Sequence, residues 1–568
     1  MTLTRALSRT LAVLFSLALI AGLAPPDAAR AAGPPRVHPR LLEEAERHPD
    51  KLVRVIVTRQ HNDRSADRQV ASKGRRKVKD VATVGFVAEI AGRDVAELGK
   101  HPAVKYIAPD APMRRASVDD SRLAPLAGQV AYQQAIGATS QWKAGLTGKG
   151  IGVAVVDTGI NRALPDFSDG AGGSRVVATQ LFSSSPTPTT VSTSPTPVST
   201  SPTPAPTGPT PTPTGPSPAP ATIAVAPTAD AVGHGTHVAG IIGGNSWTQP
   251  DPALQGKYIG VAPEVNLIDL RVSDDSGQSY LSDVVNAIEW AITNRQTYNI
   301  RVLNLSLVST VGESASTNVL AAAVERAWFS GIFVVVASGN QGPDSALYAP
   351  ANDPFVLAVG AADTLGTAGE DDDGVAWWSS YGLTQDGYGR PDLVAPGRWI
   401  PSTLASASSV LATQHPDRIV DGGYIWMSGT SMAAPVVAGT AALILQAHPE
   451  YTNDVVKWLL TSTATRLPAT VGSGAGEVNA SAALGYTGPL GAANDGLPIS
   501  LQLVTPNGAT TYATTSWSST SWSSTSWSST SWSSTSWSTS SWSTSSWSTS
   551  SWTAGAATVA PWASVDYP

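Results

Sequence analysis

The stretch 233–240, GHGTHVAG, places two histidines three residues apart among small residues. Histidine has an ordinary pKa near neutral pH, and it serves as a proton carrier or as a metal ligand. A zinc site would need a third ligand, and no acidic residue stands at the spacing of an HExxH helix. His234 could therefore be a catalytic base at the start of a helix, while a zinc site and a purely structural loop remain open.

Three further polar residues stand at the ends of expected strands or helices. They are Asp157 at the end of the apolar strand 151–157, Asn340 on a glycine-flanked turn after the apolar run 332–338, and Ser431 at the start of an apolar helix. Taken singly, each has an ordinary explanation as a turn residue or a helix cap. Taken together with His234, they supply the acid, base, nucleophile and oxyanion donor that acyl transfer requires.

A parallel sheet would bring these residues to one place. The middle of the chain, about 125–490, alternates Val/Ile/Leu-rich runs with helical patterns at 281–295 and 315–329. This alternation indicates an α/β fold with a doubly wound parallel sheet, covered on both faces. The expected strands are 151–157, 265–272, 301–307, 332–338 and 355–361. Ligand sites in such sheets gather at the carboxyl ends of the strands.

Six segments resemble the signature segments of the subtilisin-like serine proteases, the peptidase S8 family, in that family's order of Asp, His and Ser. They are VAVVDTGI, GHGTHVAG, NLSL, VASGNQG, PDLVAPG and SGTSMAAPVVAG, within about 125–485. The resemblance implies a serine endopeptidase that forms an acyl-enzyme and needs no cofactor for its chemistry. By this resemblance Asp157 orients the general base His234, and Ser431 is the nucleophile. Asn340 would then donate to the oxyanion, and His237 would be structural.

The resemblance also predicts a substrate groove, in which substrate is bound as an added strand. The corresponding residues are Ser306, Leu307, Val308, Ala337, Ser338, Gly339 and Tyr348. Val308 stands where the family usually has glycine, and Tyr348 falls near the pocket floor where a small residue is common, so both would narrow the pocket. Calcium is common in the family, but no ligand cluster stands out in this sequence, which leaves structural calcium open.

Residues 37–115 predict a small α+β domain with strands at 52–57, 84–91 and 104–110. The segment VGFVAEIAGRDVAELGKHPAVKYIAPDAPM resembles the family's inhibitor I9-like propeptide. That resemblance implies an intramolecular inhibitor removed by self-cleavage around 112–125. The stretch 36–115 has 18 basic against 11 acidic residues, whereas the chain from Ala116 onward has 15 against 31. This contrast independently favours docking of the two pieces.

The start of the chain, residues 1–32, has two arginines ahead of an apolar run and ends in small residues. This pattern is typical of a secretory signal peptide, with a single membrane anchor as the alternative. The chain has 568 residues, no cysteine and a formal net charge of −7. Thiolate chemistry and disulfides are therefore excluded, and nucleic acid binding by the acidic body is disfavoured. We expect a secreted protein that acts on proteins or peptides.

Two low-complexity zones interrupt this plan. Residues 183–222 are rich in Pro, Thr and Ser and predict a disordered insert. In the tail, 491–568, Trp recurs every five residues from Trp517 to Trp552, which matches neither the helical nor the strand period. We expect a disordered tail, with contact to glycans or the cell surface and β-type self-assembly as alternatives. A binding protein with an inactive protease fold is the rival function, although all four site residues are present.

Overall fold

The structure is a computed structural model that describes residues 36–60, 63–72, 76–82, 84–120, 130–183, 230–369, 372–468 and 471–503. The chain divides into two compact units, Met1–Pro109 and Asp110–Pro568. The expected signal peptide (1–32), all but the first residue of the Pro/Thr-rich insert (183–222) and the tryptophan repeats (517–552) lie outside the described residues.

The first unit is an antiparallel sheet with three helices. Its elements are α2 (Pro39–Arg47), β1 (Leu52–Arg59), α3 (Ser65–Ser72), β2 (Arg76–Val81), β3 (Gly85–Ala91), α4 (Gly92–Gly99) and β4 (Val104–Pro109). The strand order is β2-β3-β1-β4. Val55, Val57, Phe86 and Ile107 are fully buried between sheet and helices. The three strands expected from the sequence are present, and β2 joins them from the basic stretch.

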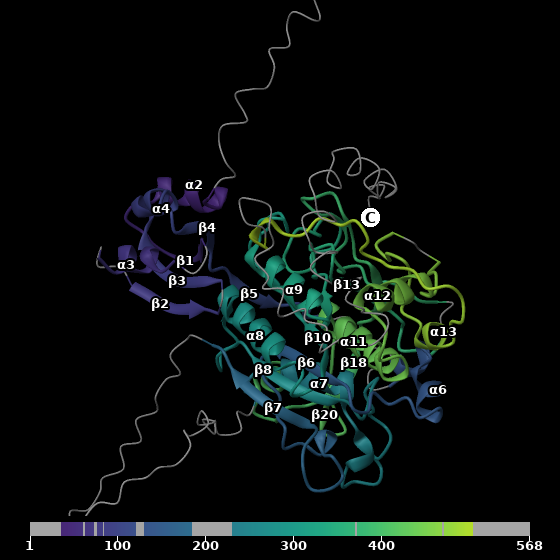
Figure 1. Ribbon diagram of the computed structural model, residues 1–568. Coiled ribbons are helices and arrows are strands. Elements are labelled where there is room, and N and C mark those ends of the chain that lie inside the picture. Colours follow the sequence, from purple (N-terminus) through teal and green to yellow (C-terminus); the bar gives the residue numbers. More distant parts are fainter. Residues whose placement is uncertain are drawn as a thin grey trace, which may run out of the picture. The chain divides into compact units, whose positions relative to one another are not determined.

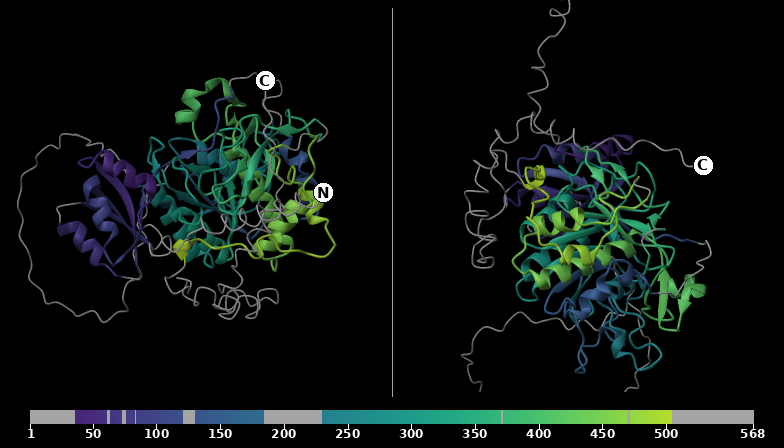
Figure 2. Two further views of the ribbon diagram at one scale, coloured as in Figure 1. Left: turned by 90° about the horizontal axis from the view of Figure 1, so that it is seen from above. Right: turned by 90° about the vertical axis from the view of Figure 1, so that its right-hand side faces the viewer.

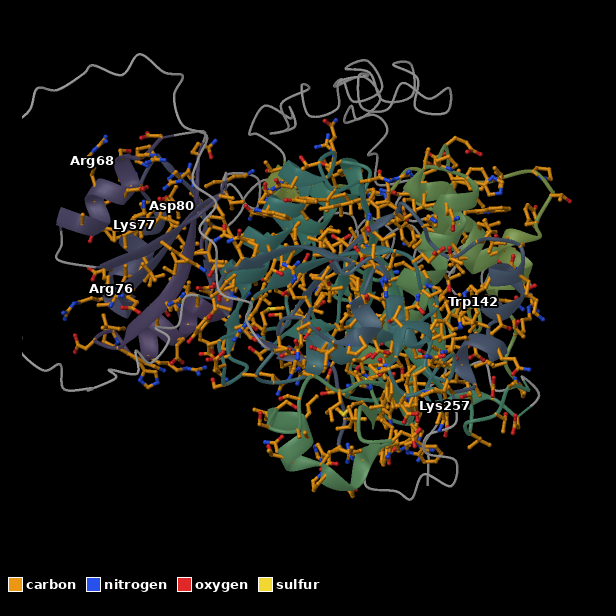
Figure 3. The ribbon with its side chains drawn as sticks, turned by 90° about the horizontal axis from the view of Figure 1, so that it is seen from below. Arg68, Arg76, Lys77, Asp80, Trp142 and Lys257 are labelled. Atoms are coloured by element: carbon orange, nitrogen blue, oxygen red, sulfur yellow. The ribbon has the colours of Figure 1, made fainter. Side chains whose placement is uncertain are left out.

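An ionic cluster ties α3 and β2 to the sheet in this unit. Arg59 on β1 lies 2.7 Å from Asp67 and 2.8 Å from Asp80, and Lys77 lies 3.0 Å and 2.9 Å from the same two carboxylates. Lys77 and Asp80 can be found together on β2 in Figure 3. The guanidinium of Arg59 donates a hydrogen bond to Asp67, and this bond raises the pKa of Arg59 above its ordinary value, although burial opposes the shift. Both cations of the cluster therefore stay charged and hold two carboxylates at once.

The second unit is built on an eight-stranded sheet. Its strands are β6 (Gly152–Asp157), β7 (Val176–Leu181), β8 (Asn266–Arg271), β10 (Ile300–Leu305), β12 (Phe333–Ala337), β13 (Leu357–Asp363), β14 (Gly374–Val375) and β17 (Leu393–Pro396). They follow the order β14-β13-β12-β10-β6-β8-β7, with β17 beside β13. All neighbours are parallel except β14. The five expected strands are confirmed, but 301–307 is split at Ser306.

Two pairs of helices pack on this sheet. The helices of the unit are α5 (Tyr132–Ala135), α6 (Ala138–Lys143), α7 (His234–Gly243), α8 (Leu281–Asn294), α9 (Val319–Phe329), α10 (Val410–Gln414), α11 (Thr430–Ala447), α12 (Asn453–Ser462) and α13 (Ala480–Leu484). Figure 1 shows α8 beside α9 and α7 beside α11. Helix α9 starts later than expected, because the Asn318 side chain accepts from the N–H groups of Leu320 and Ala321 and caps it there.

Helix α11 is the core helix of the unit. Every residue from Thr430 to Leu445 is buried, which explains why its side chains are small or apolar all round. Among the described residues it alone has the length and hydropathy of a membrane span, and 89% of that span is buried inside the unit. Each of its fully buried Val or Leu side chains contributes about 1.5–3 kcal/mol to folding by leaving water.

Small sheets and short turns complete the second unit. One three-stranded sheet contains β5 (Pro112–Arg115), β9 (Ser279–Tyr280) and β11 (Leu307–Ser309), and a second contains β18 (Ile400–Thr403), β19 (Ile419–Val420) and β20 (Tyr424–Met427). A two-stranded sheet contains β15 (Gly382–Leu383) and β16 (Gly389–Arg390). The 3₁₀ turns are η1 (Pro165–Phe167), η2 (Ser246–Thr248), η3 (Pro416–Arg418) and η4 (Leu501–Leu503).

Both ends of the second unit differ from the expected domain limits. Residues 110–115, which we assigned to the front domain, belong to the second unit. At the other end, residues 491–503, which the sequence assigns to the tail, end in η4, which packs on α9; they include the yellow segment in Figure 2. There the Ser500 N–H donates to the Glu325 carboxylate over 2.8 Å.

Candidate active site

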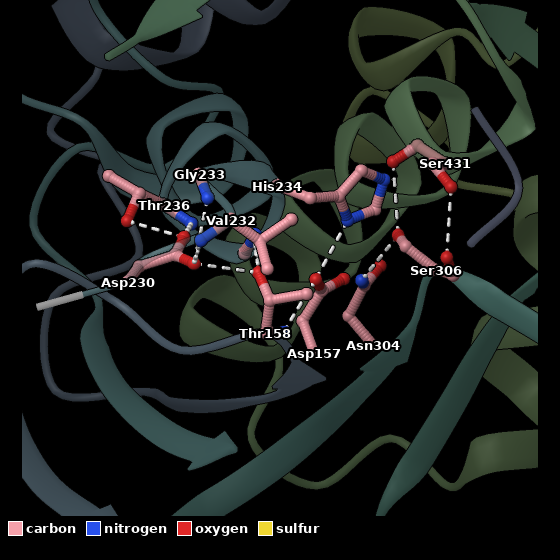
Figure 4. A network of polar contacts seen from close by, with 11 residues as sticks. Asp157, Thr158, Asp230, Val232, Gly233, His234, Thr236, Asn304, Ser306 and Ser431 are labelled. Carbon is pink, nitrogen blue, oxygen red and sulfur yellow. Dashed lines mark hydrogen bonds and ion pairs between the residues drawn. The ribbon is translucent and has the colours of Figure 1, made fainter. Parts of the chain in front are cut away.

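A buried carboxylate and a buried histidine meet at the carboxyl end of the sheet. Asp157 is the last residue of β6, and His234 is the first residue of α7. The Nδ1 atom of His234 lies 2.7 Å from Oδ1 of Asp157, and the two side chains are 0% and 2% exposed. Because a carboxylate can only accept here, Nδ1 carries the ring proton, and Nε2 is left as an acceptor. Figure 4 shows Ser431 beyond the far edge of the imidazole, with its hydrogen bonds directed to Ser306.

A glycine allows this close approach of helix and strand. A Cβ on Gly235 would lie 2.3 Å from the carbonyl oxygen of Gly159 and 3.1 Å from Cβ of Asp157. No larger residue fits there, because the start of α7 rests directly on the chain that leaves β6. The glycine after His234 in the sequence motif is therefore a packing requirement of the Asp–His pair.

Asp230 holds the loop before α7, and sequence reasoning missed it. Its Oδ1 accepts from Thr158 Oγ1 at 2.9 Å and from the Gly233 N–H at 2.8 Å, and its Oδ2 accepts from Thr236 N–H and Oγ1 at 2.9 Å each. Figure 4 shows this network beside His234. Burial raises the pKa of Asp230, although these hydrogen bonds oppose the shift. An acidic residue four positions before the histidine was the available signal.

Replacing Asp230 with alanine is expected to destabilise the loop and the site together. The change leaves several buried donors without an acceptor, so we expect the free energy of unfolding to fall by about 3–5 kcal/mol. Denaturant unfolding in a Ser431→Ala background avoids self-digestion and measures this loss. Asp251→Ala removes an exposed carboxylate of the same unit and serves as the control. Equal unfolding midpoints for the two variants would contradict the assignment.

Ser431 is the second residue of α11, where backbone N–H groups have no partner within the helix. Its side chain is buried, and its Oγ donates to the carbonyl oxygen of Ser306 over 2.9 Å. Ser306 returns a hydrogen bond from its own Oγ to the carbonyl oxygen of Ser431 over 3.0 Å, and Asn304 Nδ2 donates to Ser306 Oγ over 2.9 Å. This exchange explains why the chain leaves the sheet at Ser306, since the residue is bonded to the start of α11.

Asn340 lies beside the same helix start. Its Oδ1 accepts from the Thr430 N–H at 3.0 Å and from Thr430 Oγ1 at 2.9 Å. The orientation of the amide is therefore fixed, and its Nδ2 is a buried donor without a hydrogen-bond partner among the described residues. A fixed, unpaired donor at this point is suited to bind an oxygen that gains negative charge.

An extended segment of the chain passes this helix start. In the three-stranded sheet, β5 pairs antiparallel with β11, so that Arg115 lies opposite Leu307 and Arg114 opposite Val308. The next residue, Ala116, is buried, and its carbonyl oxygen accepts from the Ser431 N–H over 2.9 Å. A Cβ on Gly429 would lie 2.3 Å from that same oxygen, which explains the glycine before α11.

The remaining predicted groove residues fall on neighbouring elements. Ala337 ends β12, Ser338 Oγ donates to the Ser380 carbonyl over 3.1 Å, and the Gly339 N–H donates to Thr430 Oγ1 over 3.1 Å. The half-buried ring of Tyr348 lies 5.1 Å from the guanidinium carbon of Arg114, two residues before Ala116. Tyr348 thus contacts Arg114 of the extended segment through a cation–π interaction.

His237 has a different environment from His234. It is fully buried, and its Nε2 lies 3.1 Å and 2.9 Å from the carbonyl oxygens of Ile400 and Ile425, which tie α7 to β18 and β20. Burial and the neighbouring His234 lower the pKa of His237 to about 3, so it stays neutral. Within the described residues, no group of three or more His, Asp or Glu side chains could hold a metal ion. His237 is suited to a structural role.

The structure thus has an Asp–His pair at the carboxyl end of β6 and a buried serine at the start of the core helix α11, which are features expected of an α/β enzyme of the serine hydrolase class. Residues 148–486 match the model of the subtilase family, Peptidase_S8. The chain therefore belongs to the subtilase family, and it is a serine endopeptidase.

Known proteases are similar to this chain in sequence and in fold. Serine protease AprX of Bacillus subtilis (strain 168) is 41% identical over 237 residues, which cover 41% of this chain and 52% of AprX. The chain thus spans about half the length of AprX. Subtilisin NAT of Bacillus subtilis subsp. natto is 31% identical over 421 residues, 73% of this chain and 84% of the subtilisin. Fervidolysin of Fervidobacterium pennivorans, a keratinolytic enzyme related to subtilisin, shares the fold with a TM-score of 0.54 at 22% identity, covering 78% of this chain and 62% of fervidolysin.

Proposed function

We propose that this protein is an exported endopeptidase that cleaves proteins or peptides with Asp157, His234 and Ser431 and is made as a self-processing precursor. The observation that carries the proposal is the placement of Ala116. Its carbonyl oxygen accepts from the Ser431 N–H, and the residues before it pair with β11 as an added strand. A peptide substrate bound for attack by Ser431 would occupy the same place.

The proposed reaction uses each group in turn. Ser431 Oγ turns from the Ser306 carbonyl toward His234, gives its proton to Nε2 and attacks the carbonyl carbon of the bound residue. Asp157 keeps the imidazole oriented and stabilises the imidazolium. The Ser431 N–H and the free Nδ2 of Asn340 hold the oxyanion. His234 then returns the proton to the leaving amine, and water attacks the acyl-enzyme by the same route.

The precursor proposal assigns the bond Ala116–Ser117 as the first cleavage site. Ala116 is the residue whose carbonyl rests on the helix start, and Ser117 follows it toward Val118, whose N–H donates to the Ser428 carbonyl over 2.8 Å. The segment therefore crosses the groove on both sides of the bond. In this proposal the front unit is an intramolecular inhibitor until the bond is cut. Export by residues 1–32, and surface or glycan contact by the tail, rest on the sequence patterns alone.

Labelling with a fluorophosphonate tests the function directly. We expect one covalent adduct on Ser431 in the processed protein, because only a serine activated by a neighbouring base reacts with this reagent. The same treatment should abolish hydrolysis of a quenched fluorescent peptide with the sequence of residues 112–120. A protein with an inactive protease fold would give neither adduct nor hydrolysis.

A further inference from the structure

The chain is held beyond the proposed cleavage site as well as before it. After Val118 bridges to Ser428, the next two residues are both acidic, Asp119 and Asp120. In an extended chain, adjacent side chains point to opposite sides. The two carboxylates accordingly reach two different arginines of the second unit.

Asp119 forms an ion pair with Arg418, the last residue of η3. The Arg418 side chain is only 3% exposed, and its guanidinium carbon lies 4.8 Å from the centre of the Trp426 ring. Within the described part of the chain, no other carboxylate pairs with Arg418, and its Nε and Nη1 have no hydrogen-bond partner. A buried guanidinium is costly without an anion, so Arg418 is suited to bind an acidic side chain.

Asp120 forms a second ion pair with Arg398. Nε of Arg398 lies 2.7 Å from Oδ2 of Asp120, whose side chain is 1% exposed. Arg398 also contacts Asp363 at 2.5 Å, and its guanidinium carbon lies 3.9 Å from the centre of the Trp399 ring. The Trp399 ring and Asp363 hold this guanidinium in place, so that its Nε faces Asp120.

We propose that Arg418 and Arg398 form a specificity site for acidic residues on the leaving-group side of the cleaved bond, at its third and fourth positions. The site selects protein substrates with Asp or Glu at these two positions. It is filled by Asp119 and Asp120 in the precursor and becomes available when that segment leaves. This inference rests on the proposed function, because it takes Ala116–Ser117 as the bond that is cut.

Two quenched fluorescent peptides test the selectivity of the enzyme after cleavage at Ala116–Ser117. One has the sequence Pro-Met-Arg-Arg-Ala-Ser-Val-Asp-Asp, and the other ends in Asn-Asn, which keeps size and removes charge. We expect kcat/KM to be about tenfold or more higher for the acidic peptide. The Asp120 carboxylate is only 1% exposed in its ion pair, and the buried Arg418 guanidinium gains an anion from Asp119, although Asp119 itself is 68% exposed. Equal kcat/KM for the two peptides would overturn the site without any variant being needed.

Variants of Arg418 test whether this arginine recognises the third position. Arg418→Met should bring the ratio between the two peptides toward one, and Arg418→Glu should favour a peptide with Lys at the third position over one with Asp. Lys149→Met removes an exposed charge ahead of β6 and should leave the ratio at its original value. An unchanged ratio in Arg418→Met would remove Arg418 from the site. A merely structural effect would lower both rates and keep the ratio.

Active-site titration with a fluorophosphonate separates the two proposals. Protein that labels on Ser431 and cuts both peptides equally retains the proposed function and refutes the acidic site. Protein that neither labels nor cuts either peptide refutes the function itself.

Discussion

A Ser431→Ala precursor, purified and refolded alone, is expected to remain uncleaved, whereas the wild-type chain releases a front fragment that ends at Ala116. The Ala116 carbonyl already rests on the Ser431 N–H, so the variant lacks only the nucleophile. We expect kcat for peptide hydrolysis to fall by about 10⁶-fold, the order of magnitude that loss of the nucleophile costs in a subtilisin. Mass spectrometry of the released fragment identifies its last residue.

Two controls make this result specific. Ser140→Ala removes an exposed hydroxyl whose hydrogen bonds are local, one to the Gly137 carbonyl and one from Gln141 Nε2, and the variant should process normally. Adding active enzyme to the Ser431→Ala precursor should restore cleavage in trans. If the Ser431→Ala precursor processed itself at the wild-type rate, self-cleavage by Ser431 would be refuted. A wild-type fragment ending elsewhere would refute the assignment of the bond.

An Asp157→Asn variant is expected to keep its fold and lose about 10⁴-fold in kcat, as is known for other Ser–His–Asp proteases. The carboxylate accepts from Nδ1 of His234 over 2.7 Å and so fixes the proton there. An amide that donates to Nδ1 would stabilise the other tautomer, whose Nε2 cannot take the serine proton. Peptide hydrolysis with active-site-titrated enzyme measures the loss.

A second buried aspartate provides the matched control. Asp269 lies on the neighbouring strand β8, and burial raises its pKa to about 8. Near neutral pH this side chain is already largely protonated, so Asp269→Asn changes little in shape or charge. We expect Asp269→Asn to retain most of its activity. An Asp157→Asn enzyme as active as Asp269→Asn would show that the Asp–His contact has no part in catalysis.

The sequence predicted the strands of the main sheet well, because long Val/Ile/Leu runs bounded by turns have few alternative structures. The sequence predicted the ends of the strands and helices less accurately. The split at Ser306 and the late start of α9 depend on hydrogen bonds to Ser431 and on the Asn318 cap. The compact front unit ends at Pro109, before the expected limit at 115, because residues 112–115 pair with β11 and β9 of the second unit and the sequence does not identify those partners.

The sequence by itself determined the family, the order of the polar residues and the small residues around them. Tight packing at a strand end or a helix start involves residues that are neighbours in the sequence, so a short motif already contains them. Only the tertiary structure joined Asp230 to Thr158, Asp119 to Arg418 and Asp120 to Arg398. These pairs are separated by 72, 299 and 278 residues. In a sequence, a single charged residue predicts only an exposed side chain, because the partner that folding brings beside it can lie hundreds of positions away.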